Sequence, residues 1–99
     1  MDEDVRVVTL DDGTSAQVTD ARTRLRGMIV LNGAAGDVLT FRDGGSGGTV
    51  KLTISLPLNT SVVAQYLGPF PGLGILFRTN MYVASTGNNG NVHQFMISG

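Results

Sequence analysis

Apolar and polar side chains alternate in short runs along most of the chain. In residues 49–56 an apolar side chain stands at every second position, and Pro57 follows directly. A period of two is typical of a strand with one face in a core and the other in water, and proline lacks the N–H group that would continue a strand's hydrogen bonding. Residues 49–56 are therefore predicted to form a half-buried strand with these side chains on its core face: Val50, Leu52, Ile54 and Leu56.

Similar runs, divided by turn sequences, fill the rest of the chain. The other runs that favour strands are residues 5–10, 22–31, 37–43, 62–67, 74–77, 81–84 and 92–97. Turn sequences rich in glycine, asparagine and aspartate lie at residues 11–14, 32–36, 44–48 and 87–91. No stretch repeats apolar residues at helical spacing without an interrupting glycine or proline. This pattern predicts an all-β fold of about seven or eight short strands, an antiparallel β-sandwich or jelly-roll-like arrangement with no significant helix.

One of these runs, residues 22–31, is apolar on both of its strand faces. Strict alternation sets one group against the other: Arg22, Arg24, Arg26, Met28 and Val30 against Thr23, Leu25, Gly27, Ile29 and Leu31. Apolar residues on both faces, here and at residues 62–63, favour strands that are covered on two sides, either in the core or at a contact between subunits.

The first twenty residues differ from the rest of the chain. They hold six of the eight acidic residues, and residues 15–20 are polar and short-chained. We expect residues 1–20 to form an acidic N-terminal arm or an edge strand, attached to a sandwich domain at residues 21–99. A frayed terminus is the open alternative.

Charge is scarce outside this N-terminal region. Charged residues make up 15% of the 99 residues, against about 25% in an average soluble domain. No acid follows Asp43, and the charged residues after it are Lys51 and Arg78. A free monomer usually keeps a more charged surface, so the composition favours a subunit that is covered on several sides.

Composition also narrows the function classes. The chain has no cysteine, which excludes disulfides and thiolate sites. A net charge of −1 argues against a general nucleic-acid binder. No apolar run approaches the ~18 residues of a membrane span, and the acidic first residues do not resemble a secretory signal. No nucleic-acid or membrane partner is therefore expected.

Catalytic residues are sparse. His93 is the sole histidine, and a Ser–His–Asp set would have to use Ser55 or Ser85 with Asp37 or Asp43. No Gly-x-Ser-x-Gly motif accompanies these residues, and a lone histidine in a strand is more often a structural or interface residue. We therefore expect no catalytic residue.

Other chemistry is equally weakly supported. Asp37 and Asp43 lie ~20 Å apart on one extended strand, too far for a pair of glycosidase carboxylates, and turn capping is the simpler role. The oxygen-rich residues 2–4 and 11–13 do not fit a twelve-residue calcium loop. The glycine-rich residues 44–48 lack the lysine and the helix of a phosphate-binding loop. We expect no metal, no cofactor and no small-molecule substrate.

A row of three arginines is the most distinctive charged feature. Arg22, Arg24 and Arg26 recur at ~7 Å intervals on one strand face. The negative charge that faces these arginines could belong to the acidic arm of a neighbouring subunit, to an acidic partner surface or to nucleic acid. Alternatively, the arginines form a solvated strand face with no partner. Interleaved aromatic residues, typical of single-strand binders, are absent from this row. The candidate contact residues are Asp2, Glu3, Asp4, Asp11, Asp12, Arg22, Arg24, Arg26, Phe70 and His93.

Residues 22–97 resemble the small β-sandwich virion proteins of tailed bacteriophages. The resemblance rests on four segments in order: LRGMIVLN at 25–32, GDVLTFRD at 36–43, GTVKLTISLP at 48–57, and GILF at 74–77 leading to MYV at 81–83. Two departures stand out. Asn80 replaces a glycine that is common in the family, and residues 68–72 form a longer, more apolar insert around Phe70 that we interpret as a contact loop.

The resemblance implies a structural role in the virion. Such proteins commonly decorate the head as cement proteins, binding the major capsid protein as homotrimers at local threefold positions. It implies a location on the capsid surface after synthesis in the host cytoplasm. The alternatives are another virion component, in the neck, tail or head fibre, and a small carbohydrate- or host-surface-binding module. The last would use Tyr66, Phe70 and Tyr82, although the chain has no tryptophan.

Overall fold

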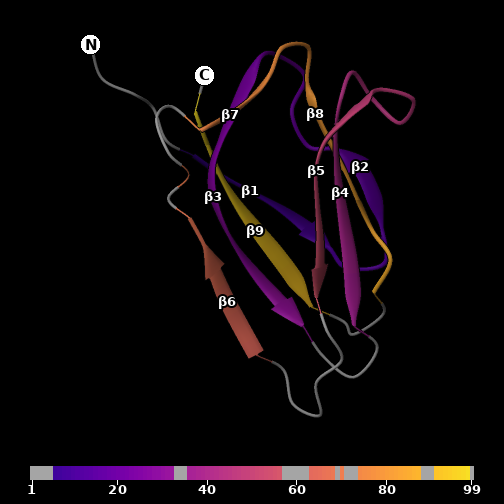
Figure 1. Cartoon of the computed structure of the whole chain (residues 1–99), viewed down its shortest axis with the longest axis vertical. Coiled ribbons are helices and arrows are strands. Elements are labelled where there is room, and N and C mark those ends of the chain that lie inside the picture. The colour runs from indigo at the N-terminus through magenta and orange to yellow at the C-terminus, as the bar shows by residue number, and fades with distance from the viewer. Residues whose placement is uncertain are drawn as a thin grey trace.

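The computed structural model describes residues 6–32, 36–56, 63–68, 70, 74–87 and 91–98. Within these residues the chain forms nine strands and no helix (Figure 1), so the all-β prediction is confirmed. No helix in this described part is long and apolar enough to cross a membrane. The strands are β1 (Arg6–Asp11), β2 (Ser15–Gln17), β3 (Thr23–Asn32), β4 (Asp37–Asp43), β5 (Thr49–Leu56), β6 (Val63–Leu67), β7 (Ile75–Phe77), β8 (Met81–Ser85) and β9 (Val92–Ser98).

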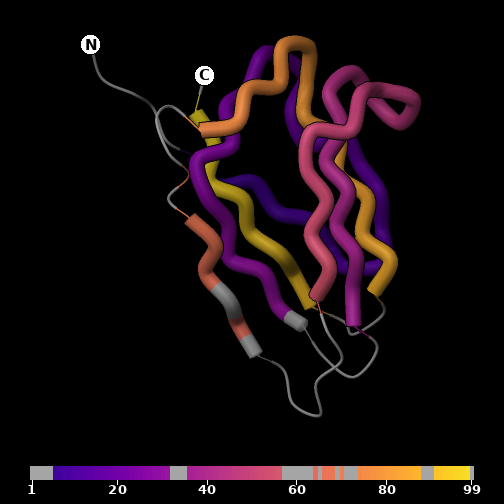
Figure 2. Tube along the Cα trace, in the orientation of Figure 1, coloured from indigo at the N-terminus to yellow at the C-terminus, as the bar shows by residue number. Residues whose placement is uncertain are grey.

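The strands pair in two antiparallel sheets that form a small β-sandwich. The five-stranded sheet has the order β1-β9-β3-β6, and β7 also pairs with β3. The four-stranded sheet has the order β2-β8-β4-β5. The chain passes from one sheet to the other between β1 and β2 (Figure 2). Residues 6–17 thus supply one edge strand to each sheet, and residues 1–5 lie outside the described part.

The core lies between the sheets and is lined by alternate residues of most strands. The side chains of Phe41 and Phe95, from opposite sheets, meet edge to face with ring centroids 5.3 Å apart, a favoured geometry for aromatic pairs. The buried apolar side chains are Leu10, Leu25, Met28, Val30, Leu39, Phe41, Leu56, Phe77, Met81, Val83, Phe95 and Ile97.

A β-bulge changes which residues of β3 face the core. The pairing of β3 with β9 shifts register between Leu25 and Gly27, and the extra residue reverses the side-chain alternation beyond it. Leu25, Met28 and Val30 are all fully buried. The predicted strict alternation is therefore wrong after Leu25, because residues 28–31 are apolar on both faces and so give no sign of where the extra residue falls.

A second register shift affects β5. Phe41 pairs with Leu52 but Arg42 pairs with Val50, so Lys51 is the extra residue. Val50 consequently faces outward and is 45% exposed, which corrects its predicted place on the core face. Leu52 and Ile54 do pack against the core and are only partly buried, because β5 is an edge strand.

Candidate functional site

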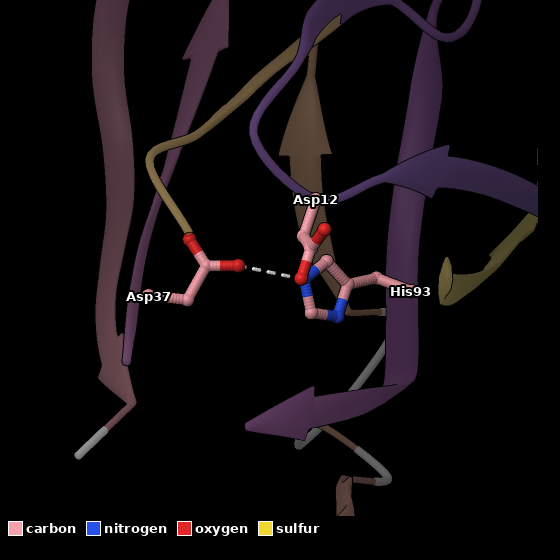
Figure 3. A group of neighbouring side chains, drawn as sticks. All are labelled: Asp12, Asp37 and His93. Carbon is pink, nitrogen blue, oxygen red and sulfur yellow. Dashed lines mark hydrogen bonds and ion pairs between the residues drawn. The ribbon is translucent and has the colours of Figure 1, made fainter. Parts of the chain in front are cut away.

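Three ionisable side chains that are far apart in the sequence meet inside the sandwich. Asp12 follows β1, Asp37 begins β4 and His93 lies near the start of β9. Figure 3 shows the two carboxylates beside the imidazole ring, and one ligand atom of each residue lies within 4.8 Å of the others. The exposed fractions are 9% for Asp12, 5% for Asp37 and 0% for His93. Because β4 and β9 belong to different sheets, the cluster joins the two layers.

The Asp37 carboxylate accepts hydrogen bonds from the last residue of β8 and from the loop that follows this strand. The Ser85 hydroxyl lies 2.8 Å from Oδ1 and 2.7 Å from Oδ2. The backbone N–H groups of Thr86 and Gly87 donate to Oδ1 at 2.9 and 2.8 Å. Burial by itself raises the pKa of Asp37, but the hydrogen bonds from Ser85, His93 and Gly87 outweigh burial and hold that pKa below its usual value. The carboxylate is therefore ionised at neutral pH.

Close approach of the loop to this carboxylate requires glycine at position 87. A Cβ atom on Gly87 would lie 2.7 Å from the carbonyl oxygen of Gly36 and 2.8 Å from Cγ of Asp37. Both distances are shorter than any ordinary contact, so a side chain there would push the loop and its N–H donors away from Asp37.

The hydrogen bonds of His93 define its protonation state. The backbone N–H of Leu31, on β3, donates to Nδ1 at 3.1 Å, so Nδ1 carries a lone pair and the proton resides on Nε2. Nε2 then donates to Oδ2 of Asp37 at 2.8 Å. His93 thus bridges a backbone donor of one sheet and a carboxylate of the other.

Ser85, His93 and Asp37 do not form a nucleophilic triad, although the sequence offered that combination. In a triad the serine hydroxyl donates to histidine and histidine donates to aspartate. Here Ser85 and His93 both donate to the same carboxylate, and Ser85 Oγ accepts from the backbone N–H of Gly13 at 3.1 Å. The three side chains are at most 5% exposed. The arrangement acts as a hydrogen-bonded link between strands, and its burial corrects the expectation that His93 is a surface contact.

The same geometry argues against a metal site at Asp12, Asp37 and His93. A histidine that binds a metal through Nε2 normally carries its proton on Nδ1, but the Leu31 N–H points at Nδ1. Ligation through Nδ1 would displace that same N–H. Asp11 also cannot join Asp12 at an ion, since Asp11 pairs with Val92 on the outside of the sheet and is exposed.

Asp43 has the turn-capping role that the sequence suggested. Its carboxylate accepts the backbone N–H groups of Arg78 at 2.8 Å and Thr79 at 2.9 Å, in the turn between β7 and β8. The hydrogen bond from Thr79 is the largest effect on its pKa and, with those from Arg78 and Asn80, lowers that pKa against a smaller opposing effect of burial. Asp37 and Asp43 therefore serve separate loops at the two ends of β4.

The remaining predicted contact residues are spread over the molecule. Arg22 is exposed, whereas Arg24 and Arg26 are half-buried, and Nη1 of Arg26 lies 3.4 Å from the Ser98 hydroxyl. Phe70 packs against the core, and its backbone N–H donates to the carbonyl of Arg26 at 2.9 Å. Asp2, Glu3 and Asp4 lie outside the described residues.

The outer face of the five-stranded sheet is mostly apolar. Residues paired across antiparallel strands share a face, and the pairs Val7–Met96 and Ile29–Tyr66 place these four side chains on the outside. Val7 and Tyr66 are each 56% exposed. We call this surface the apolar face and define it by Val7, Ile29, Leu31, Tyr66, Val92 and Met96.

The outer face of the four-stranded sheet is more polar. Threonine and serine side chains dominate it, with two exposed valines among them. We call it the polar face and define it by Ser15, Gln17, Val38, Thr40, Arg42, Val50, Thr53, Ser55 and Tyr82. Tyr66 and Tyr82 thus lie on opposite sides of the sandwich, so they do not form one aromatic platform.

Comparisons with family models, with curated proteins and with solved structures found no match to this chain.

Proposed function

We propose that this chain is a non-enzymatic structural protein of a tailed-phage virion. Its role is that of a capsid decoration (cement) protein, which binds the major capsid protein on the mature head as a homo-oligomer. The resemblance of residues 22–97 to such proteins supports the proposal, since its quoted segments coincide with β3, β4, β5, β7 and β8.

One observation carries this proposal. The polar side chains that could perform chemistry, Asp37, Ser85 and His93, are bonded to one another in the interior, whereas an apolar sheet face lies outside. Exposed apolar patches mark surfaces that contact other macromolecules. These features favour a protein that functions by binding other macromolecules.

Such a protein would stabilise a shell by mass action. A ligand that binds the mature shell but not its precursor shifts the equilibrium toward the mature state, and many identical sites multiply the effect. This mechanism needs affinity, which an exposed apolar face favours, and a high copy number on the shell.

Quantitative mass spectrometry of purified virions of a phage that encodes this chain tests the proposal. We expect a copy number close to that of the major capsid subunit. A few per cent of that number would assign the chain to the neck, tail or fibres, and absence from virions would overturn the virion role and favour the binding-module alternative. The separation of Tyr66 from Tyr82 does not favour a carbohydrate platform, and a glycan screen at high protein concentration checks this.

A further inference from the structure

Apolar side chains occur on all four strands of this face, and one exposed polar pair, Thr9 and Gln94, lies among them. Val7 of β1 pairs with Met96 of β9, which pairs with Gly27 of β3. A Cβ atom on Gly27 would lie 3.5 Å from both the Tyr66 hydroxyl and Cε of Met96, so these two side chains cover the glycine. The tyrosine ring nevertheless remains 56% exposed. Part of this apolar surface is therefore covered by neighbouring side chains of the same sheet, and a large part is exposed.

Among the residues that the structure describes, charges lie only at the two ends of this face. Arg24 and Arg26 stand where β3 begins, beside the end of β9 at Ser98. Asp11 stands where β1 ends, opposite Val92. Because β1 and β3 are both antiparallel to β9, they run in the same direction. One end of the face is thus positive, the other negative, and the described residues between them on this face are uncharged.

We propose that a second copy of this chain covers the apolar face, related to the first by a two-fold axis that runs across the strands. Such an axis reverses the strand direction, so the arginine end of each copy lies over the Asp11 end of the other. An axis along the strands would set arginines against arginines. Charge complementarity therefore selects one orientation, and the same patch serves both partners, as a two-fold interface requires.

The size of the face indicates how strong this pairing is. Strands ~4.8 Å apart and residues ~3.3 Å apart give a face four strands wide and about five residues long a projected area of roughly 300 Å². Stable dimers bury about 800 Å² per partner. The dimer is therefore weak in solution and forms at high local concentration, as on a crowded shell.

The inference goes beyond the proposed function, because it concerns self-association of this chain whereas that function concerns binding to a capsid. The family resemblance implies trimers, whereas this pairing produces dimers. The mass of the chain in solution without capsids tests the dimer, and a separate capsid-binding assay tests the proposed function, so the two proposals can fail independently.

Sedimentation velocity of the full chain, at about 5 to about 500 micromolar, tests the pairing across the range of weak interfaces. The wild type should shift from monomer toward dimer as its concentration rises. Val7→Glu should weaken the dimer about tenfold or more, because it places a negative charge in an apolar contact at the end that faces Asp11 of the other copy. The matched control is Val50→Glu, which alters a similarly exposed valine (45%) on the polar face and should leave the dimer unchanged. Melting curves of all variants establish that they are folded.

A charge exchange tests the orientation. Arg24→Glu and Asp11→Lys should each weaken the dimer, and the double variant should recover most of the loss, because each end then meets its opposite charge again. A capsid surface as the occupant would give no such recovery.

Three results would overturn the inference: a monomer at every concentration, a trimer, or equal effects of Val7→Glu and Val50→Glu. Loss of capsid binding by Val7→Glu without any change of mass would reassign the apolar face to the capsid and leave the proposed function intact. A normal dimer that binds no mature capsid would retain the inference and remove the function.

Discussion

Asp37 and Asp43 occupy the two ends of β4 and perform the same local task in different surroundings. Each accepts backbone N–H groups from a loop next to β8. Asp37 is 5% exposed and also bonds His93 of the opposite sheet, whereas Asp43 is half-buried. The pKa of each is lowered by hydrogen bonds against the opposing effect of burial, which is the largest single effect for Asp37 and the second-largest for Asp43.

The comparison shows that burial, more than the number of hydrogen bonds, determines how much a polar residue contributes to the free energy of unfolding. Water replaces a lost partner at an exposed turn, but it cannot replace one between packed sheets. The two residues should therefore respond very differently to the same substitution, although the sequence presents both as aspartates at the ends of a strand.

The largest effect is expected for Asp37→Ala. The change leaves buried donors of Ser85, Gly87 and His93 without their acceptor, and removal of one partner from a buried charged network costs about 3–5 kcal/mol. Urea unfolding followed by circular dichroism measures the loss. If the purified variant is unfolded, the same measurement on Asp37→Asn, which keeps one carbonyl oxygen, supplies a smaller loss of the same sign. Stability equal to that of the wild type would show that the cluster does not hold the sheets together.

The sequence did not predict this cluster, because it favoured His93 as a contact residue and a turn-capping role for Asp37. Alternation nevertheless sets His93 on one side of its strand with Phe95 and Ile97, and Asp37 on one side with Leu39 and Phe41. Those patterns place both residues inward, as the structure has them. They do not reveal that β4 and β9 face each other from different sheets, because that depends on which strands pair. The combination of Ser85, Asp37 and His93 was dismissed on sequence spacing, which carries no information about contacts between sheets.

The two β-bulges could not be predicted either, because they also depend on how the strands pair. Alternation assumes that each strand stays in register with its neighbour, and one extra residue in a pair reverses the faces that follow. The apolar Ile29 and Leu31 were assigned to the same side as Leu25, but the bulge places them on the opposite, outer face. The apolar face therefore emerged only from the observed pairing.

A smaller loss of about 2–3 kcal/mol is expected for His93→Leu. Leucine fills most of the buried volume, but the Leu31 N–H is left without its acceptor, and Asp37 loses one of its donors. Gln94→Leu, at the neighbouring outward position of β9, is the control and should stay within about 0.5 kcal/mol of the wild type. Equal stability of the two variants in urea unfolding would contradict the structural role of the histidine.

Acid should weaken the fold through the same two carboxylates, by less than Asp37→Ala because a protonated carboxyl still forms hydrogen bonds. Both pKa values are lower in the folded state than the usual 3.8, so the folded protein binds fewer protons than the unfolded chain. The free energy of unfolding should hold above about pH 4 and fall as the pH drops through the folded-state values. The titratable neighbours of Asp37 are His93 and Asp12.

Urea unfolding at a series of pH values from about 6 to 2, for the wild type and Asp43→Asn, measures this dependence. The variant should retain most of the slope if Asp37 dominates. If the stability of Asp43→Asn no longer changes with acid, the pH dependence comes from Asp43, and Asp43 rather than Asp37 is the more important carboxylate.

The smallest effect is expected for Asp43→Ala, about 0.5–1 kcal/mol. The N–H groups of Arg78 and Thr79 lose an acceptor, but the site is open enough for water to take its place. Asp43→Asn keeps one carbonyl oxygen and should lie between the alanine variant and the wild type. Urea unfolding of both variants beside Asp37→Ala gives the ratio of the two sites directly. A loss at Asp43 as large as that at Asp37 would mean that the turn between β7 and β8, and not the link between the sheets, limits the stability of this sandwich.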